Sequence, residues 1–207
     1  MYILREYQQN AVHDAIKWIK STLDPGLIEA YTAAGKSMIV AEIARVVTCM
    51  TGKKVLVLQP NKELLIQNVA KYKLTGEQCS IFSASAGQKS VRYNVVYATA
   101  LTVKNMLGAF CEKFCLVILD EADASLTPTI LSIIDSIRAK NPKLRVIGLT
   151  SSPYKLGYGY IYKMDINGKP VPEDQSRDVF HQANSAYIRA LFIGARLCIA
   201  NHHRRDK

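Results

Sequence analysis

The sequence lacks the features that mark membrane, secreted and zinc-binding proteins. Its longest unbroken apolar run, Phe114 to Leu119, has six residues, whereas a membrane-spanning helix needs roughly 18. The N-terminus reaches Arg5 and Glu6 before any apolar stretch builds, so no signal peptide is expected. The cysteines number five, an odd count, they form no zinc-type pair of doublets, and Cys111 and Cys115 have no histidine nearby. We therefore expect a cytoplasmic protein in a reducing compartment, without a disulfide scaffold or a membrane partner.

Acidic residues are few relative to basic ones. The sequence has 27 Lys and Arg against 17 Asp and Glu, which gives a formal net charge of +10. Such an excess suggests a polyanionic partner, most simply nucleic acid, because Lys and Arg side chains release counterions from phosphates. A soluble basic protein with no such partner would carry the same charge, so charge alone leaves both alternatives open.

Short apolar strands alternate with amphipathic helices along the 207 residues, a length that fits one domain with an appendage. Residues 55–58 and 116–119 are apolar at every position, as strands buried on both faces require. The pattern predicts an α/β fold in which helices cover both faces of a mostly parallel sheet. We expect strands near 27–30, 55–58, 80–83, 95–98, 116–119 and 146–149, and helices near 6–23, 36–50, 62–72, 101–110 and 128–140.

The pattern changes after about Tyr154. Three glycines and two prolines between residues 157 and 172 mark a loop or hairpin region. A helical stretch is predicted to follow from about Arg177 to Ala200. We therefore expect residues 1–154 to form the main domain and residues 155–207 to form a short irregular or helical C-terminal extension.

A candidate phosphate-binding loop (P-loop) spans residues 30–37, Ala-Tyr-Thr-Ala-Ala-Gly-Lys-Ser, between a predicted strand and a predicted helix. Backbone amides of the loop and the helix N-terminus favour an anion at this place. Lys36 would neutralise phosphate charge, and the Ser37 hydroxyl would ligate Mg²⁺. Ala30 stands where the usual pattern has its first glycine, so an ordinary lysine at a helix start remains an alternative.

Two adjacent carboxylates, Asp120 and Glu121, directly follow the buried strand 116–119. The C-terminal edge of a parallel sheet is where α/β proteins build their sites. Asp120 would hold Mg²⁺, directly or through water, and Glu121 would orient and polarise the attacking water. An acidic helix N-terminus is the alternative for this pair. The presence of both motifs, each at a strand end, favours a site for phosphates and Mg²⁺.

These motifs resemble those of the N-terminal ATPase domain of superfamily 2 helicases of the DEAD/DEAH-box type. The resemblance is closest to the RadD-like and type III restriction-helicase branch, and it runs from about Ile3 to Gly168. It implies a three-layer RecA-like fold. It also implies a DNA-binding helicase or translocase that couples Mg·ATP hydrolysis to movement on nucleic acid.

The resemblance assigns the adenine and the phosphates of ATP to two segments. Residues 4–8, Leu-Arg-Glu-Tyr-Gln, look like the opening motif of this branch, whose Arg and Gln contact adenine; Arg5 and Gln8 match these positions. Gln8 can offer both a donor and an acceptor, whereas Arg5 has only donors and could instead hold a carboxylate. A solvent-facing helix residue is the alternative for Gln8. The phosphate-binding residues that the resemblance implies are Thr32, Ala33, Ala34, Gly35, Lys36 and Ser37.

Further segments resemble motifs of the nucleic-acid path. Residues 55–64 are similar to motif Ia, residues 95–99 to motif Ic, and residues 147–157 to motif III, which couples hydrolysis to movement. Threonines at strand ends can donate to a phosphodiester backbone without reading bases, although such threonines can equally be helix N-caps. The residues implied are Pro60 and Thr99 for nucleic acid, and Asp123, Thr150 and Ser152 for coupling.

Two positions depart from the family pattern. Ala33 stands where the family usually has glycine, and its Cβ hinders a positive φ or a close phosphate approach. We therefore expect weakened nucleotide affinity. Residues 150–153 read Thr-Ser-Ser-Pro where the family usually has Thr-Ala-Thr-Pro, and they keep hydroxyls at both ends.

A larger departure concerns the second RecA-like domain, which in the family supplies arginines that stabilise the transition state. Nothing after Gly168 resembles it, and roughly 40 residues are too few to form one. The expected partners are therefore DNA, favoured over RNA by the family branch alone, and a second RecA-like domain or protein that supplies the arginines. Residues 155–207 would be the truncated start of that domain or a tail. The alternative function is a non-catalytic nucleotide- and DNA-binding module.

Overall fold

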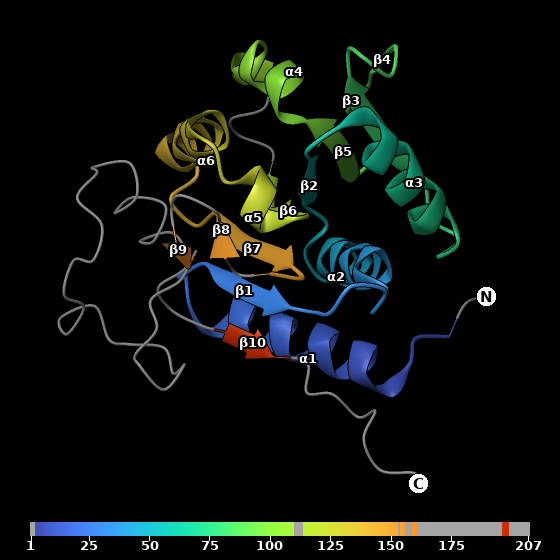
Figure 1. The fold of residues 1–207 in the computed structure, drawn as a ribbon. Helices are drawn as coiled ribbons and strands as arrows, with labels where there is room; N and C mark the ends of the chain where they lie inside the picture. The colour runs from blue at the N-terminus through green and yellow to red at the C-terminus, as the bar shows by residue number, and fades with distance from the viewer. Residues whose placement is uncertain (1–2, 110–113, 153, 156–158, 161–195, 199–207) are drawn as a thin grey trace, which may run out of the picture.

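The computed structural model describes residues 3–109, 114–152, 154–155, 159–160 and 196–198 (Figure 1). Its main feature is one eight-stranded sheet with the order β10-β1-β7-β6-β2-β5-β3-β4. Neighbouring strands pair in parallel throughout, except for the antiparallel pair β3–β4. The strands are β1 (Gly26–Glu29), β2 (Lys54–Gln59), β3 (Cys79–Ser83), β4 (Gln88–Lys89), β5 (Val95–Thr99), β6 (Phe114–Leu119), β7 (Arg145–Thr150) and β10 (Arg196–Cys198). The predicted mostly parallel sheet is confirmed.

Helices cover both faces of this sheet and give the molecule three layers (Figure 1). One face packs against α1 (Glu6–Ser21), α2 (Lys36–Thr51) and α3 (Lys62–Lys73). The other packs against α4 (Ala100–Lys104), α5 (Ala122–Ser125) and α6 (Pro128–Lys140). A 3₁₀ turn (Leu107–Ala109) follows α4, and a separate hairpin joins β8 (Tyr154–Lys155) to β9 (Gly159–Tyr160).

The hydrophobic core consists of two clusters, one on each face of the sheet. Leu56 and Leu58 of β2 face the α4–α6 side, whereas Val55 and Val57 face the α1–α3 side. Successive strand residues point to opposite faces, so a strand covered on both sides must be apolar at each position. This explains the unbroken apolar runs in the sequence.

Local capping fixes the helix starts that the sequence predicts at residues 62 and 128. The Asn61 side chain accepts a hydrogen bond from the Leu64 amide at 2.9 Å, at the start of α3. The Thr127 hydroxyl accepts one from the Ile130 amide at 3.3 Å, ahead of α6. Each bond satisfies a backbone N–H that has no partner within its helix.

Two predictions for the elements need correction. The helix expected over 101–110 is the shorter α4 followed by the 3₁₀ turn, and residue 110 lies outside the described residues. The hairpin strand β4 was not predicted. Most of the helix expected from Arg177 to Ala200 also lies outside the described residues, but Arg196–Cys198 form strand β10 instead. These three residues satisfy backbone groups along the edge of β1. Within the described residues, no helix is long and apolar enough to cross a bilayer.

Candidate functional site

The segments that carry the predicted motifs meet at one edge of the sheet. Strands β1, β7, β6 and β2 are parallel neighbours, so their carboxyl ends share that edge. Backbone hydrogen bonds bind these ends together: the Ala30 amide donates to the Thr150 carbonyl at 2.9 Å, and the Asp120 amide to the Leu58 carbonyl at 3.3 Å. The loop after β1 and the carboxylates after β6 therefore lie in one site.

The loop between β1 and α2 contains two left-handed residues. Gly35, the N-cap of α2, has φ +74°, and Ala33 has φ +66°. A left-handed conformation costs an alanine about 1–2 kcal/mol relative to the right-handed one, whereas glycine adopts it freely. Ala33 therefore adopts the positive φ that its Cβ makes unfavourable, and its backbone is strained.

Gln8 fixes this loop from helix α1. Its Nε2 donates to the Ala34 carbonyl at 2.9 Å, and its Oε1 accepts from the Arg5 amide at 3.0 Å. The Tyr7 hydroxyl donates to the same carbonyl at 3.1 Å. A Cβ on Gly35 would lie 2.5 Å from Gln8 Nε2, so the side chain and the loop are in close contact. Gln8 is 7% exposed, which excludes the alternative of a solvent-facing residue.

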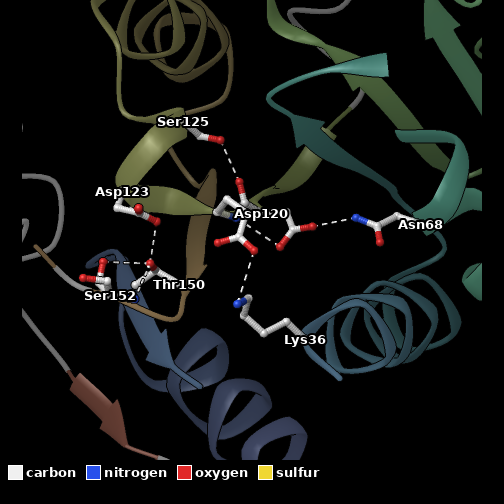
Figure 2. A network of polar contacts seen from close by, with 8 residues as sticks. Lys36, Asn68, Asp120, Asp123, Ser125, Thr150 and Ser152 are labelled. Carbon is white, nitrogen blue, oxygen red and sulfur yellow. Dashed lines mark hydrogen bonds and ion pairs between the residues drawn. The ribbon is translucent and has the colours of Figure 1, made fainter. Parts of the chain in front are cut away.

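Lys36 forms an ion pair with Glu121 across the site, and Figure 2 labels the Lys36 side chain. The Lys36 Nζ and Glu121 Oε1 atoms are 3.2 Å apart. Glu121 has φ +46°, a left-handed conformation that turns the chain between β6 and α5. The ion pair joins the start of α2 to the end of β6, and it shows that Lys36 Nζ can bind an anionic oxygen at this position.

Asp120 is buried beside this ion pair. Its Oδ2 accepts from Asn68 Nδ2 at 2.6 Å, and its Oδ1 accepts from the Glu121 amide at 3.0 Å (Figure 2). Its backbone carbonyl accepts from the Ser125 hydroxyl at 2.6 Å. Burial raises the pKa of the Asp120 carboxyl, and the Asn68 amide, the Glu121 backbone amide, the Gln59 amide and the Lys36 ammonium counteract that rise. A nearby cation would stabilise the charged form of such a buried carboxylate.

The three residues expected to couple hydrolysis to movement also meet. The Thr150 hydroxyl donates to Asp123 Oδ1 at 2.5 Å, and its oxygen accepts from the Ser152 amide at 3.1 Å (Figure 2). These contacts join the end of β7 to the first turn of α5. Ser152 takes part through its backbone.

Pro60 and Thr99 lie at the same sheet edge, on the side of β2 away from the loop. Gln59 pairs with Thr99, so Pro60 directly follows the residue beside Thr99. Thr99 occupies the N-cap position of α4 without a side-chain capping bond; its hydroxyl donates to the Ser83 hydroxyl at 3.0 Å. The Thr99 hydroxyl therefore makes no N-capping bond, which excludes that alternative role for it.

The donor set fits a Mg·nucleotide. Mg²⁺ is usually held by one or two carboxylates together with substrate phosphates rather than by an all-protein cage. Among the described residues, no cluster of three His, Cys, Asp or Glu side chains could hold a metal. Asp120 supplies one buried carboxylate, and Ser37 stands in the first turn of α2 next to Lys36. Thr32 is exposed on the loop.

Sequence reasoning missed Asn68. It shares the buried face of α3 with Leu65, Val69 and Tyr72, and it is 1% exposed. A polar residue among apolar ones at helical spacing was the signal that could have identified it.

The chain is similar to known proteins in sequence and in fold. The family model for the type III restriction enzyme, res subunit, matches residues 1–155. The UvsW helicase from Bacteriophage T4 is similar at a TM-score of 0.61 and 21% identity, over 73% of this chain and 54% of that one. The helicase domain of Pyrococcus furiosus Hef is similar at a TM-score of 0.59 and 27% identity, over 74% and 34%. The chain thus spans about half or less of these structures.

A third similar structure is a nuclease-deletion mutant of the Type ISP restriction-modification enzyme LlaGI in complex with a DNA substrate mimic. Its TM-score is 0.55 at 19% identity, over 74% of this chain and 18% of that one. No curated protein matches the chain. The shared architecture confirms the RecA-like fold that the sequence resemblance implied.

Proposed function

The chain belongs to the family of the type III restriction enzyme res subunit, within the superfamily 2 helicases, and on this premise we propose that it is the ATP-binding half of an ATP-dependent DNA helicase or translocase. In this proposal the chain couples Mg·ATP hydrolysis to movement on DNA. The observation that carries the proposal is the 3.2 Å contact between Lys36 and Glu121. It brings the residue that would bind phosphate and the residue that would activate water to one point.

Each residue of the phosphate site has a distinct task in this proposal. The Lys36 ammonium binds phosphate oxygens, and backbone amides of residues 32–37 surround them. Once Lys36 pairs with phosphate, the Glu121 carboxylate is released to orient and polarise a water. Asp120 and the Ser37 hydroxyl would hold Mg²⁺, which when bound would neutralise charge on the phosphates.

The adenine would lie near the start of α1, against Arg5 and Gln8. Gln8 Nε2 donates a hydrogen bond to the Ala34 carbonyl. A base that contacts Gln8 would therefore be linked to the phosphate loop through this side chain. Among the described residues Arg5 pairs with no carboxylate, and its guanidinium contacts the Tyr7 hydroxyl at 3.3 Å. Its donors therefore remain available to a ligand.

Nucleic acid would pass over the β2 and β5 ends, at Pro60 and Thr99. The net charge of +10 supports a polyanionic partner, and the family branch favours DNA over RNA. Thr150, with Asp123 and Ser152, would transmit the state of the nucleotide site to that path. Such an ATPase would work in the cytoplasm.

The domain organisation is also a proposal. Residues 1–154 would be the ATP-binding domain and residues 155–207 an extension, of which strand β10 pairs with β1. A second RecA-like domain, or a protein that supplies it, would bring the arginines that complete the site. Because an arginine supplied in trans is worth about 10³–10⁵ in rate in related phosphate-hydrolysing systems, hydrolysis by this chain alone would be weak.

A second candidate function is a non-catalytic nucleotide- and DNA-binding module. The Cβ of Ala33, a residue with φ +66°, favours it, because a side chain at this position hinders the close approach of a phosphate to the loop. Phosphate release distinguishes the two functions: a motor half hydrolyses some ATP and is stimulated by DNA, whereas a binding module releases no phosphate under either condition.

Titration with a fluorescent ATP analogue tests the site itself. Lys36→Ala should abolish Mg·ATP binding because it removes the charge that faces the phosphates. Lys62→Ala is a matched control, since Lys62 also begins a helix after a strand but is exposed on α3. Equal binding by wild type and Lys36→Ala would overturn the site assignment.

A further inference from the structure

Asn68 makes a contact that connects two separate parts of the site. Its amide lies on α3, and Nδ2 reaches Asp120 Oδ2 at 2.6 Å, across 52 residues of sequence (Figure 2). Both side chains are almost fully buried. A buried amide without a partner is costly, and a hydrogen bond to a carboxylate is stronger than one between neutral groups. The Asn68 amide is therefore held in one orientation, with Nδ2 toward Asp120.

The contact leaves Asp120 with its carboxylate plane fixed. Asn68 holds Oδ2 while the Glu121 amide holds Oδ1, so the carboxylate cannot rotate without breaking a bond. Each carboxylate oxygen has two lone-pair directions, so both oxygens keep capacity for a further ligand. The group is thus oriented yet not saturated.

Further polar side chains surround Asp120, and not all of their atoms have partners. Asn68 Oδ1 is buried with no hydrogen bond, and the Gln59 amide lies beside Asp120, where it lowers the pKa of the carboxyl. Gln59 directly follows Leu58, which pairs with Leu119, so Gln59 and Asp120 are neighbours at the sheet edge. Unsatisfied buried groups cost about 1–3 kcal/mol each, and a purely structural core would replace them with apolar side chains. Their position beside Asp120 therefore indicates a role at the site.

Helix α3 also begins at the segment expected to contact nucleic acid. Asn61 caps the helix directly after Pro60 and the end of β2. A shift of α3 along its axis would move Asn68 relative to Asp120, because a helix moves as a rigid element.

We propose that Asn68 is a positioning residue that orients the Asp120 carboxylate for Mg²⁺ and ties that orientation to helix α3. This inference rests on the proposed function, since it concerns the same metal site. Partners that hold metal ligands in place typically change metal affinity by 10- to 100-fold when removed. We expect a loss of about 10-fold in the Mg²⁺-dependent part of nucleotide affinity.

The test measures the affinity of the full chain for a fluorescent ATP analogue with Mg²⁺ and with EDTA. Asn68→Leu keeps the branched shape of the side chain and removes the donor; it should lower the Mg²⁺-bound affinity about 10-fold and leave the EDTA affinity unchanged. Asn141→Leu is the matched control, because Asn141 Nδ2 donates to the Phe114 carbonyl at the opposite end of β6. Asn141→Leu should keep the wild-type ratio of the affinity with Mg²⁺ to the affinity with EDTA.

The ratio remains informative when a variant folds poorly. An unfolded fraction lowers both affinities equally, so their ratio reports the metal-dependent part alone. Asn68→Ala, which adds no bulk, provides the second variant. A wild-type ratio retained in both Asn68 variants, or an equal fall in both affinities, would overturn the positioning role while leaving the proposed function intact. If wild type binds no nucleotide under either condition, the proposed function fails together with this inference.

Discussion

The Thr150 hydroxyl donates a hydrogen bond to the Asp123 carboxylate at 2.5 Å, and Thr150 is fully buried. The bond joins the last residue of β7 to the first turn of α5, on the far side of Asp120 from Asn68 (Figure 2). One end comes from the segment that resembles motif III, and the other comes from the segment directly after the Asp120–Glu121 pair. A change in position of α5 therefore reaches the end of β7 through one direct contact.

Thr150→Val should preserve nucleotide binding but abolish the stimulation of hydrolysis by DNA. Valine has nearly the same shape but leaves the Asp123 carboxylate and the Ser152 amide without the hydroxyl, so we expect a stability loss of about 1–3 kcal/mol. Affinity for Mg·ATP should stay near that of wild type, whereas DNA should no longer stimulate phosphate release. Chemical denaturation and a phosphate-release assay with and without DNA measure these effects.

Thr127→Val is the control for this prediction. It removes the N-cap bond of α6 at 3.3 Å and should cost about 1 kcal/mol of stability. Because Thr127 caps α6 and contacts none of the coupling residues, DNA stimulation should persist. Loss of stimulation in both variants would mean that reduced stability, rather than the Thr150–Asp123 bond, explains the effect.

A substitution in the phosphate loop, Ala33→Gly, should tighten nucleotide binding. Ala33→Gly removes a Cβ from a residue with φ +66°. Relief of that strain, less the greater backbone entropy of glycine when unfolded, should stabilise the chain by about 0.5–1 kcal/mol. Nucleotide affinity should rise a few-fold, as measured by titration with a fluorescent ATP analogue.

Gly35→Ala is the opposite change in the same loop. Its Cβ would lie 2.5 Å from Gln8 Nε2 at a φ of +74°, so the Gln8–Ala34 contact should break and nucleotide binding should fall. If Ala33→Gly and Gly35→Ala changed affinity in the same direction, backbone strain would not be what limits binding.

The sequence predicted six of the eight strands of the large sheet and most helices within one or two residues, for physical reasons. Residues 55–58 and 116–119 are apolar at every position, a pattern that favours doubly covered strands. Asn61 and Thr127 precede their helices as capping residues. These signals are local, so they can be seen without knowledge of the partner segment.

The features that the sequence missed depend on distant partners. Strand β10 exists because residues 196–198 pair with the edge of β1, which no local pattern reveals. Asn68 contacts Asp120 across 52 residues, and Lys36 meets Glu121 only because β1 and β6 flank β7 in the sheet. The motifs located the site, but the contacts between motifs required the strand order.

Cys79 provides a prediction for stability against pH. Burial raises its pKa from the model-compound value of 9.0 to about 11. Below pH 9 the thiol is protonated in both states, so it contributes no pH dependence. Between pH 9 and 11 the unfolded thiol ionises while the folded one stays protonated, so stability falls as pH rises, by up to about 3 kcal/mol. Cys79→Ala should lose this part of the slope in denaturation curves.

Cysteine alkylation checks the same burial independently. At pH 8, exposed Cys49 should react quickly with iodoacetamide, whereas Cys79 should be protected in the folded chain. Peptide mass mapping identifies the modified residue. Rapid alkylation of Cys79 without unfolding would contradict the burial that raises its pKa.

Glu121→Gln should preserve nucleotide binding and lower turnover. The amide cannot accept a proton from water or polarise it as a carboxylate does, so hydrolysis should fall by 10²-fold or more. Removal of the carboxylate also frees Lys36 from its 3.2 Å ion pair, so affinity for Mg·ATP should be unchanged or slightly higher. Glu63→Gln, at an exposed first-turn position of α3, should leave both quantities unchanged. The decisive measurement is single-turnover phosphate release with saturating nucleotide and DNA, because it isolates the hydrolytic step from binding. Wild-type turnover by Glu121→Gln would remove Glu121 from the chemistry and leave the ion pair with Lys36 as its sole role.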